Sequence, residues 1–259
     1  MNRSYPFAVV LWFFTFTVLL SSCVSVKKYR YFNITRDSIT QAVSDLPEIA
    51  IQKNDLLSIT VSSLNDQDAK LYNMPNIVAG AGPNALPGGY LVDEDGNIQF
   101  QVLGTLKAAG LTKKELQQDI VNRLIEKKLL LDPIVSIRNL NFRVTVLGEV
   151  LHPTVVNVPS EKINLLEALG DAGDLTIYGN RSNVLVIREE NHHRTFKVIN
   201  LNSADIFTSD YFYLKPNDIV YVEPNKTKTT NAGFAKEWLP LVFSSLSFVT
   251  LALWRLRGL

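Results

Sequence analysis

Short segments in which apolar and polar residues alternate occur between residues 51 and 222, and this alternation is the pattern of half-buried β-strands. In the segment NDLLSITV, Leu57, Ile59 and Val61 occupy every second position, so their side chains would share one face of a strand. The segments IVSIR and FRVTVLGEV, and both halves of NVLVIREENHHRTFKVINL, follow the same rule. The pattern predicts a protein built mainly from short strands.

A tight turn is predicted within the segment YLVDEDGNIQFQVLG. Asp95-Gly96 is a dipeptide that favours two-residue hairpin turns, and Ile98, Phe100 and Val102 alternate after it. We therefore expect a β-hairpin whose two strands flank this dipeptide.

One long segment repeats apolar residues every three or four positions, as an amphipathic helix does. Leu116, Ile120 and Leu124 would share a face of this helix, and Thr112 with Glu115 has the spacing of a capping box at its start. We expect the helix to continue until Asp132-Pro133, because proline disfavours helical backbone in the residue before it.

A second, shorter helix is predicted to begin at Asn164, with Glu167 in the first turn. Gly170 or Gly173 would end it, since glycine readily adopts the left-handed backbone that closes helices. Strands that alternate with only a few helices indicate an α+β fold.

One short pattern occurs twice. KNDLLSITV at Lys53 and PNDIVYVEP at Pro216 both place Asn-Asp before aliphatic residues that alternate along a strand. The echo indicates either one turn-into-strand device repeated in two related modules or a chance similarity.

The N-terminal residues 1–22 have the features of a secretory signal, with Arg3 before an apolar run that is short for a membrane span. Leu20-Ser21-Ser22-Cys23 resembles the lipobox of bacterial lipoproteins, in which the cysteine thiol receives a diacylglycerol through a thioether. Acyl chains anchor a protein at about 0.8 kcal/mol per buried methylene. The alternatives are a buried structural cysteine and an ordinary signal with a chance thiol.

The composition limits which partners, disulfides and cofactor sites this chain can have. The formal net charge of +1 leaves no phosphate-binding footprint, so we expect no nucleic acid partner. The single cysteine excludes an internal disulfide and any site with several thiolates. His192 and His193 would point to opposite faces of an extended chain, so we interpret them as part of a solvated turn and expect neither a metal nor another cofactor besides the lipid on Cys23.

The C-terminal segment is the second apolar end of the chain. From Leu239 to Leu256 a helix would extend about 27 Å, close to the hydrocarbon thickness of a bilayer. Trp238 and Trp254 would lie at its two ends as membrane-interface residues. We therefore predict a transmembrane helix at residues 238–257.

Polar residues lie along one side of this predicted helix. They are Ser244, Ser247, Thr250 and Arg255, mixed with Phe243 and Trp254. In a ring of such helices these side chains would line a wet pore while the opposite, apolar stripe meets lipid. The alternative is a single-span anchor whose serines bond back to their own helix.

Several motifs in order resemble the polysaccharide export family of bacterial outer-membrane lipoproteins, the Wza-like proteins. The motifs are QKNDLLSITV, DEDGNIQFQVLGTLKAAGLTKKELQQDIVNRL and LLLDPIVSIR for the export domain, and VTVLGEVLHPTVVNVP, NLLEALGDAGDL and YLKPNDIVYV for a β-grasp-like SLBB module. The chain departs from the family pattern at three glycine positions, which Asn54, Asp174 and Asn217 occupy here. Asparagine tolerates the left-handed backbone that such glycines adopt.

The resemblance implies a subunit of a capsule or exopolysaccharide translocon. It implies a periplasmic ring of identical copies, octameric in characterised members, with a helical pore through the outer membrane. It also implies an inner-membrane co-polymerase/tyrosine-kinase partner and, because Val24 and Ser25 follow the cysteine without an acidic residue, sorting to the outer membrane. Most of the chain would then lie in the periplasm.

Two other functions are open from the sequence. The first is a glycan-binding lipoprotein that is tethered to the outer membrane and forms no channel. The second is an enzyme such as a glycan hydrolase, for which the available acids are Asp55, Asp93, Asp95, Glu149, Asp171 and Asp218. Each of these acids lies beside a turn, a glycine or a strand entry, and no pair stands out for acid–base chemistry, so we expect no enzymatic activity.

These expectations divide the chain into six parts: a lipoprotein signal peptide at 1–22, a lipid-anchored tether at 23–46, an export domain at 47–140, an SLBB domain at 141–225, a linker at 226–237 and a transmembrane helix at 238–257.

Overall fold

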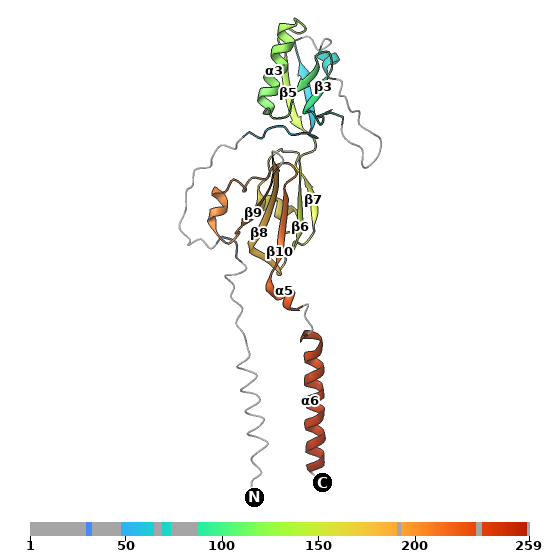
Figure 1. Cartoon of the computed structure of the whole chain (residues 1–259), viewed down its shortest axis with the longest axis vertical. Helices are drawn as coiled ribbons and strands as arrows, with labels where there is room; N and C mark the ends of the chain where they lie inside the picture. The colour runs from blue at the N-terminus through green and yellow to red at the C-terminus, as the bar shows by residue number, and fades with distance from the viewer. Residues whose placement is uncertain are drawn as a thin grey trace.

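The computed structural model describes residues 30–32, 48–64, 69–73, 88–190, 193–231 and 235–257. The predicted signal peptide and Cys23 lie outside these residues. Two α+β domains are stacked end to end along the long axis, and a long helix extends beyond the second domain (Figure 1).

The first domain holds a three-stranded sheet, a separate hairpin and one long helix. Its elements are β1 (Leu56–Ser62), η2 (Lys70–Tyr72), β2 (Tyr90–Leu91), β3 (Asn97–Phe100), β4 (Gly104–Lys107), α3 (Lys113–Glu126) and β5 (Ile134–Asn139). The antiparallel sheet has the order β2-β1-β5, with Leu57 opposite Tyr90 on one side and Asn139 on the other. Leu57, Ile59 and Val61 are all buried, as the alternation predicted.

The predicted hairpin is wrong in its strand pairing. Asp95-Gly96 does form a tight turn, with Gly96 at a φ of 81°. However, β3 pairs with the strand that follows it, β4, while β2 pairs with β1. The backbone N–H of Val92 donates to the carbonyl of Asp55 at 2.9 Å, which joins this segment to β1. The hairpin turn lies instead at Val102, whose φ is 70°.

The helix α3 begins as predicted and ends earlier than predicted. Thr112 and Glu115 form both hydrogen bonds of the capping box. The last helical residue is Glu126, because Lys128 adopts a left-handed φ of 53°. The N–H of Leu129 then donates to the carbonyl of Leu124 at 2.9 Å, and this closing pattern ends the helix before Asp132-Pro133.

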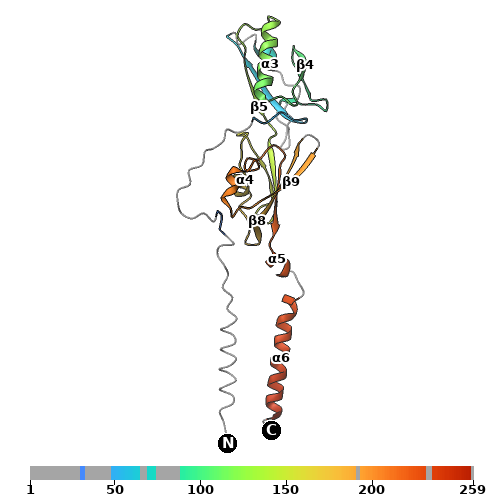
Figure 2. The same ribbon diagram turned by 60° about the vertical axis from the view of Figure 1, so that its left-hand side comes forward.

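The second domain is a five-stranded sheet in the order β7-β6-β10-β8-β9, with β6 and β10 parallel and the other pairs antiparallel. Its elements are β6 (Arg143–Gly148), β7 (Thr154–Asn157), α4 (Leu165–Asp171), β8 (Gly179–Glu190), β9 (His193–Ile199), η3 (Ala204–Thr208) and β10 (Ile219–Pro224). The helices α4 and η3 pack on one face of the sheet, where Leu165, Leu169 and Ile206 join the core (Figure 2). Asn164 and Glu167 form a second capping box, and Gly173, with a φ of 80°, follows the helix.

Two helices follow the second domain, α5 (Lys226–Asn231) and α6 (Ala235–Arg257). The sequence therefore predicted a helix correctly at 238–257. Among the described residues, however, no helix combines the length and the apolar character that a membrane crossing needs. This finding corrects the prediction of a transmembrane helix at 238–257.

Candidate functional site

The repeated Asn-Asp pattern forms the same turn in both domains. Asn54 and Asn217 have left-handed φ angles of 67° and 65°. In each turn the aspartate carboxylate accepts a backbone N–H from three residues earlier, from Gln52 to Asp55 and from Lys215 to Asp218, both at 2.8 Å. The echo is thus a turn-into-strand device used twice, and asparagine adopts the backbone that the sequence comparison expected.

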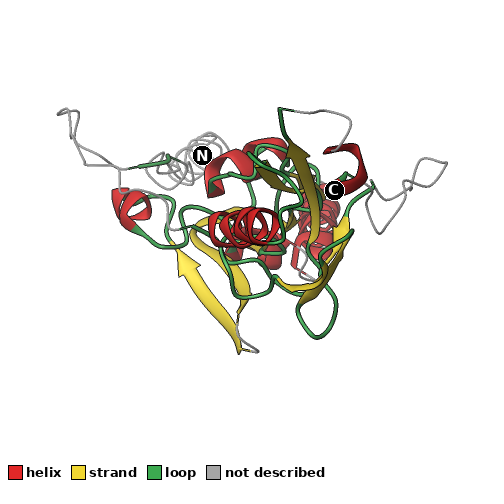
Figure 3. Cartoon of the chain, turned by 90° about the horizontal axis from the view of Figure 1, so that it is seen from above, coloured by secondary structure: helices red, strands yellow, loops and turns green. Residues whose placement is uncertain are grey.

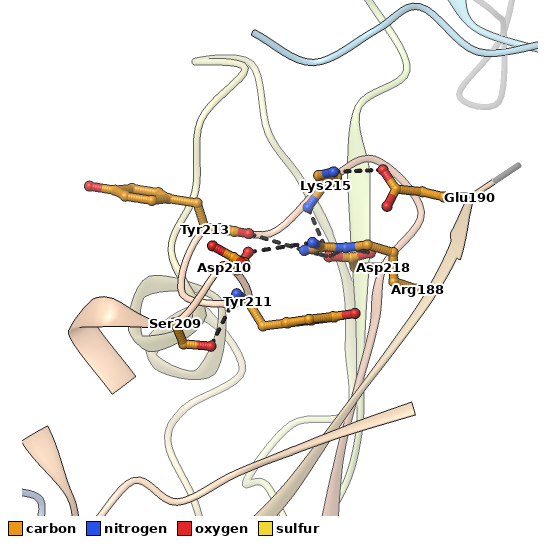
Figure 4. Close-up of polar contacts among 8 residues, drawn as sticks. All are labelled: Arg188, Glu190, Ser209, Asp210, Tyr211, Tyr213, Lys215 and Asp218. Atoms are coloured by element: carbon orange, nitrogen blue, oxygen red, sulfur yellow. Dashed lines mark hydrogen bonds and ion pairs between the residues drawn. The ribbon is translucent and has the colours of Figure 1, made fainter. Parts of the chain in front are cut away.

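Asp218 is also the centre of a buried ion pair (Figure 4). The guanidinium of Arg188 donates to Asp218 Oδ2 at 2.7 Å, and it lies over the ring of Tyr211 at 4.4 Å. The same guanidinium donates to the backbone carbonyls of Tyr213 at 3.1 Å and Asp210 at 3.4 Å. Arg188 therefore holds the loop between η3 and β10 in a fixed shape.

The sequence analysis did not single out Arg188, although the pattern contained a signal for it. Val184 and Val186 are core-facing residues of β8, and Arg188 follows at the next position of the same alternation. A charged residue at an inward position must be paired, because an isolated charge is costly to bury. The partner, Asp218, comes from another strand and could not be identified from the local pattern.

Four of the six acids available to an enzyme have structural partners, namely Asp218 in its ion pair with Arg188 and Asp55, Asp93 and Glu149 as follows. Asp55 accepts a backbone N–H in its turn, and burial raises the pKa of its carboxyl, against the opposing effect of the Gln52 N–H. Asp93 accepts the N–H of Asn97 at 2.8 Å. Glu149 pairs with Lys228 and accepts the hydroxyl of Thr176 at 3.0 Å. Asp171 ends α4.

The described residues also contain no group of three His, Cys, Asp or Glu side chains that could hold a metal ion.

Glu161 connects the two domains. It lies in the loop between β7 and α4, with a left-handed φ of 57°. Its carboxylate forms an ion pair with Lys113 at the start of α3 and accepts the backbone N–H of Asn139 at the end of β5. One side chain of the second domain thus binds a helix and a strand of the first. No feature of the sequence indicated this role.

A cleft of about 400 Å³ lies at this joint. The first domain contributes Lys113, Lys114 and Gln117 from α3, and the second contributes Lys162 and Tyr213. The ammonium of Lys162 lies 4.8 Å from the centre of the Tyr213 ring. Such ammonium, amide and phenol groups can bind hydroxyl or carboxylate groups. The cleft therefore offers polar groups for a hydroxylated ligand beside the apolar side chains of Ile49, Ile163 and Leu214.

Residues 30–32 of the predicted tether lie against the second domain. The backbone N–H of Phe32 donates to the carbonyl of Leu201 at 3.1 Å, and the Phe32 ring lies 5.0 Å from that of Phe207. The Tyr31 hydroxyl donates to Asp174. Burial and this carboxylate raise the pKa of Tyr31 above its usual value. The sequence predicted a lipid-anchored tether at 23–46 and gave no indication that it docks on the second domain.

The predicted pore residues lie on α6. Ser244 and Ser247 are exposed, and their hydroxyls donate to the carbonyls of Leu241 at 2.9 Å and of Ser244 at 2.8 Å. These are the bonds of the alternative in which serines bond back to their own helix. Thr250 and Trp254 belong to the same helix, Arg255 is exposed, and Trp238 is 49% exposed. Residues at 244, 247 and 250 are one turn apart along one side of α6.

Comparison with known proteins finds a family match for each of the two domains. Residues 43–140 match the family model described as polysaccharide biosynthesis/export protein, and residues 142–222 match that of the SLBB domain. The chain is similar to "EPS I polysaccharide export outer membrane protein EpsA" of Ralstonia solanacearum, with 30% identity over 159 residues, which cover 58% of this chain and 41% of the relative.

The protein of the same name from Ralstonia nicotianae (strain ATCC BAA-1114 / GMI1000) is 35% identical over 104 residues, 39% of this chain and 27% of that relative. The aligned regions thus span less than half the length of either relative. The motif-based resemblance is confirmed by these matches.

Proposed function

We propose that this chain, a member of the Wza-like polysaccharide export proteins, is a subunit of an outer-membrane assembly that exports capsular or extracellular polysaccharide. The chain carries a polysaccharide export domain followed directly by an SLBB domain. The observation that carries the proposal is the adjoining pair of matches in a chain similar to a protein named for this export. The subunit performs no bond chemistry. Identical copies form a ring around a hydrated path for the polymer.

The membrane anchor in this proposal is the lipid on Cys23. Tyr31 lies eight positions after Cys23, and an extended chain spans at most about 3.5 Å per residue, so the docked tether allows a reach of at most about 28 Å. The contacts of Tyr31 and Phe32 with the second domain would therefore keep the SLBB domain close to the membrane surface.

The export domain would face away from that membrane. It lies at the end of the molecule opposite α6 and away from residues 30–32 (Figure 1). In this position it is available to an inner-membrane partner of the co-polymerase/tyrosine-kinase type, which we propose docks on this domain. Most of the chain would then occupy the periplasm.

The polymer path would include the hydroxyl-bearing side of α6, with Ser244, Ser247 and Thr250, and with Arg255 near its end. The Ser244 and Ser247 hydroxyl protons are used within the helix, but their oxygens can still accept hydrogen bonds from sugar hydroxyls. Weak, repeated contacts of this kind suit a polymer that must keep moving.

The test is complementation of a strain that lacks the gene. The wild-type chain should restore surface polysaccharide, measured by quantitative immunoblotting of intact cells, and a chain that ends at Lys236 should not restore it. Cys23→Ser should leave an unprocessed precursor that takes up no labelled palmitate. Surface polysaccharide that is undiminished in the deletion strain would refute the export function.

The cleft at the domain joint favours one alternative, a glycan-binding lipoprotein that forms no channel. Lys114, Lys162 and Tyr213 could hold a sugar residue there without any assembly. The two functions differ in the mass of the detergent-extracted protein. A protein that remains monomeric at all concentrations would support the binding function instead of the conduit.

A further inference from the structure

One face of the SLBB sheet is apolar and exposed. On the other face, Val144, Val146, Val184, Val186, Val220 and Val222 belong to the core beneath α4 and η3. The residues that alternate with them form two rows across the strands, one with Val155, Thr145, Ile219, Ile187 and Phe196 and one with Leu147, Tyr221, Leu185 and Val198. We call this surface the open face.

Its side chains are accessible in the described structure. Phe196 is 60% exposed, Val198 52%, Val155 49% and Leu147 42%. Phe196 and Val198 lie on β9, an edge strand that projects with β8 from one side of the molecule (Figure 3). A sheet face that remains in water normally carries polar side chains. The apolar rows of the open face therefore indicate a partner.

Polar residues border the two apolar rows. Arg143 on β6, Glu189 on β8 and Arg194 on β9 lie two positions from residues of the first row, so they face the same side and border it. Arg194 and Glu189 form an exposed ion pair. Asn183 and Glu223, which bond each other, border the second row. An apolar centre with a polar rim is the anatomy of a protein–protein interface.

The spacing of strands and residues gives the flat open face an area on the order of 400 Å². A stable interface takes about 800 Å² from each partner, so the open face would supply roughly half of it. The remainder must come from neighbouring surfaces, and the partner must be large enough to reach them. A folded domain meets this requirement.

The opposite side of the same domain carries several exposed carboxylates. Glu167, Asp171, Asp205 and Asp210 are exposed on α4, on η3 and in the loop that follows η3. Phe207, which is 40% exposed, adds an apolar side chain to this acidic side. The rim of the open face also holds Glu189, paired with Arg194, and Glu223, so Arg143 is the rim cation that would lie opposite these carboxylates when the two sides meet.

We propose that the open face binds the α4–η3 side of a second copy of this chain. This inference rests on the proposed function, which requires a ring. A head-to-tail contact between two different surfaces of one subunit can close a ring, whereas two open faces packed on each other would give a dimer and stop. The inference therefore assigns both surfaces of the subunit contact.

Photo-crosslinking of the full-length, detergent-extracted protein locates the contact without weakening it. A benzoylphenylalanine placed at Val198 should crosslink to a peptide of a second copy that contains residues 165–171 or 204–210, identified by mass spectrometry. Crosslinks from Val198 to β9 of the second copy, or only to another protein, would overturn the assignment.

Substitution tests the same surface independently. Phe196→Asp should reduce the fraction of assembled protein in native mass spectrometry at least tenfold, with the circular dichroism spectrum unchanged. Leu131→Asp, at a residue that is 98% exposed in the first domain, is the matched control and should assemble as the wild type does. If Phe196→Asp misfolds, the photo-crosslinking from Val198 tests the contact by itself.

The two failures can be told apart. Assembly that is unchanged in Phe196→Asp, in a protein whose deletion still abolishes surface polysaccharide, overturns the interface and leaves the export function standing. A wild-type protein that is monomeric, in a deletion strain with normal surface polysaccharide, overturns both.

Discussion

Asp55 and Asp218 occupy equivalent positions in two copies of one turn, one at the entrance of β1 and one at the entrance of β10. Each carboxylate accepts a backbone N–H from three residues earlier at 2.8 Å, after an asparagine in left-handed backbone. The two sites differ in charge, because Asp218 is paired with Arg188 and Asp55 forms no ion pair with any described residue. The same turn therefore holds an ion-paired carboxylate in the second domain and, within the described part of the chain, an unpaired one in the first. Two measurements can test this difference.

Removing the charge of Asp218 should strongly destabilise the SLBB domain. Asp218→Asn leaves the Arg188 guanidinium buried without its carboxylate, and breaking a buried pair in this way costs about 3–5 kcal/mol. Urea unfolding followed by circular dichroism measures the loss. Asp119→Asn is the control, because it breaks a partly exposed pair with Arg123 on α3 that contributes about 0.3–0.5 kcal/mol. Equal losses in the two variants would contradict the structural role of Arg188.

The stability that Asp55 gives the first domain, relative to its asparagine variant, should decrease as the pH rises. Burial raises the carboxyl pKa in the folded state, so the folded protein holds the proton more tightly than the unfolded chain. This contribution is fully present below the unfolded pKa of about 3.9 and is lost as the pH rises through the folded pKa. The free energy of unfolding of the wild type, minus that of Asp55→Asn, should fall between pH 4 and pH 7. A constant or rising difference would contradict the prediction.

Gly148 should not tolerate a side chain. It has a φ of 91°, and a Cβ added there would lie 2.1 Å from the carbonyl oxygen of Val222 on the parallel strand β10. Gly148→Ala should cost more than 3 kcal/mol, because backbone strain and a clash within a sheet act together.

Gly110 provides the matched comparison for this glycine. It has a similar φ of 90°, and no atom lies within 4 Å of its added Cβ. Gly110→Ala should therefore show only the left-handed strain, about 1–2 kcal/mol. Thermal unfolding of both variants separates the two contributions, and similar losses would show that the contact with Val222 is unimportant.

The docked tether should protect the bond that follows Arg30 from trypsin. Phe32→Ala removes the ring contact with Phe207, and Tyr31→Phe removes the hydrogen bond to Asp174. Each variant should increase the initial rate of cleavage at Arg30 severalfold, because proteolysis follows the population of the undocked state. Phe248→Ala, at a residue of α6 that is 74% exposed, should cleave at the wild-type rate. Unchanged cleavage in both tether variants would show that the segment does not hold to the domain.

The sequence alone predicted features that depend on near neighbours. The burial of Leu57, Ile59 and Val61 follows from alternation, and the capping box at Thr112 and the helix start at Asn164 follow from residues three positions apart. The ordered motifs also indicated the family that the domain matches confirm. The predicted end of α3 was too late, and the cause is again local. Lys128 adopts the left-handed backbone that is expected of glycine or asparagine, and this ends the helix.

Only the tertiary structure decided which distant residues meet. The pairing of β3 with β4 and of β2 with β1, the partner of Arg188, and the contacts of Glu161 and Tyr31 all join segments that a one-dimensional pattern does not relate. The physical reason is the range of the forces involved. Backbone preference and periodicity act over a few residues, whereas strand pairing and buried charge depend on where the whole chain places its hydrogen-bond partners.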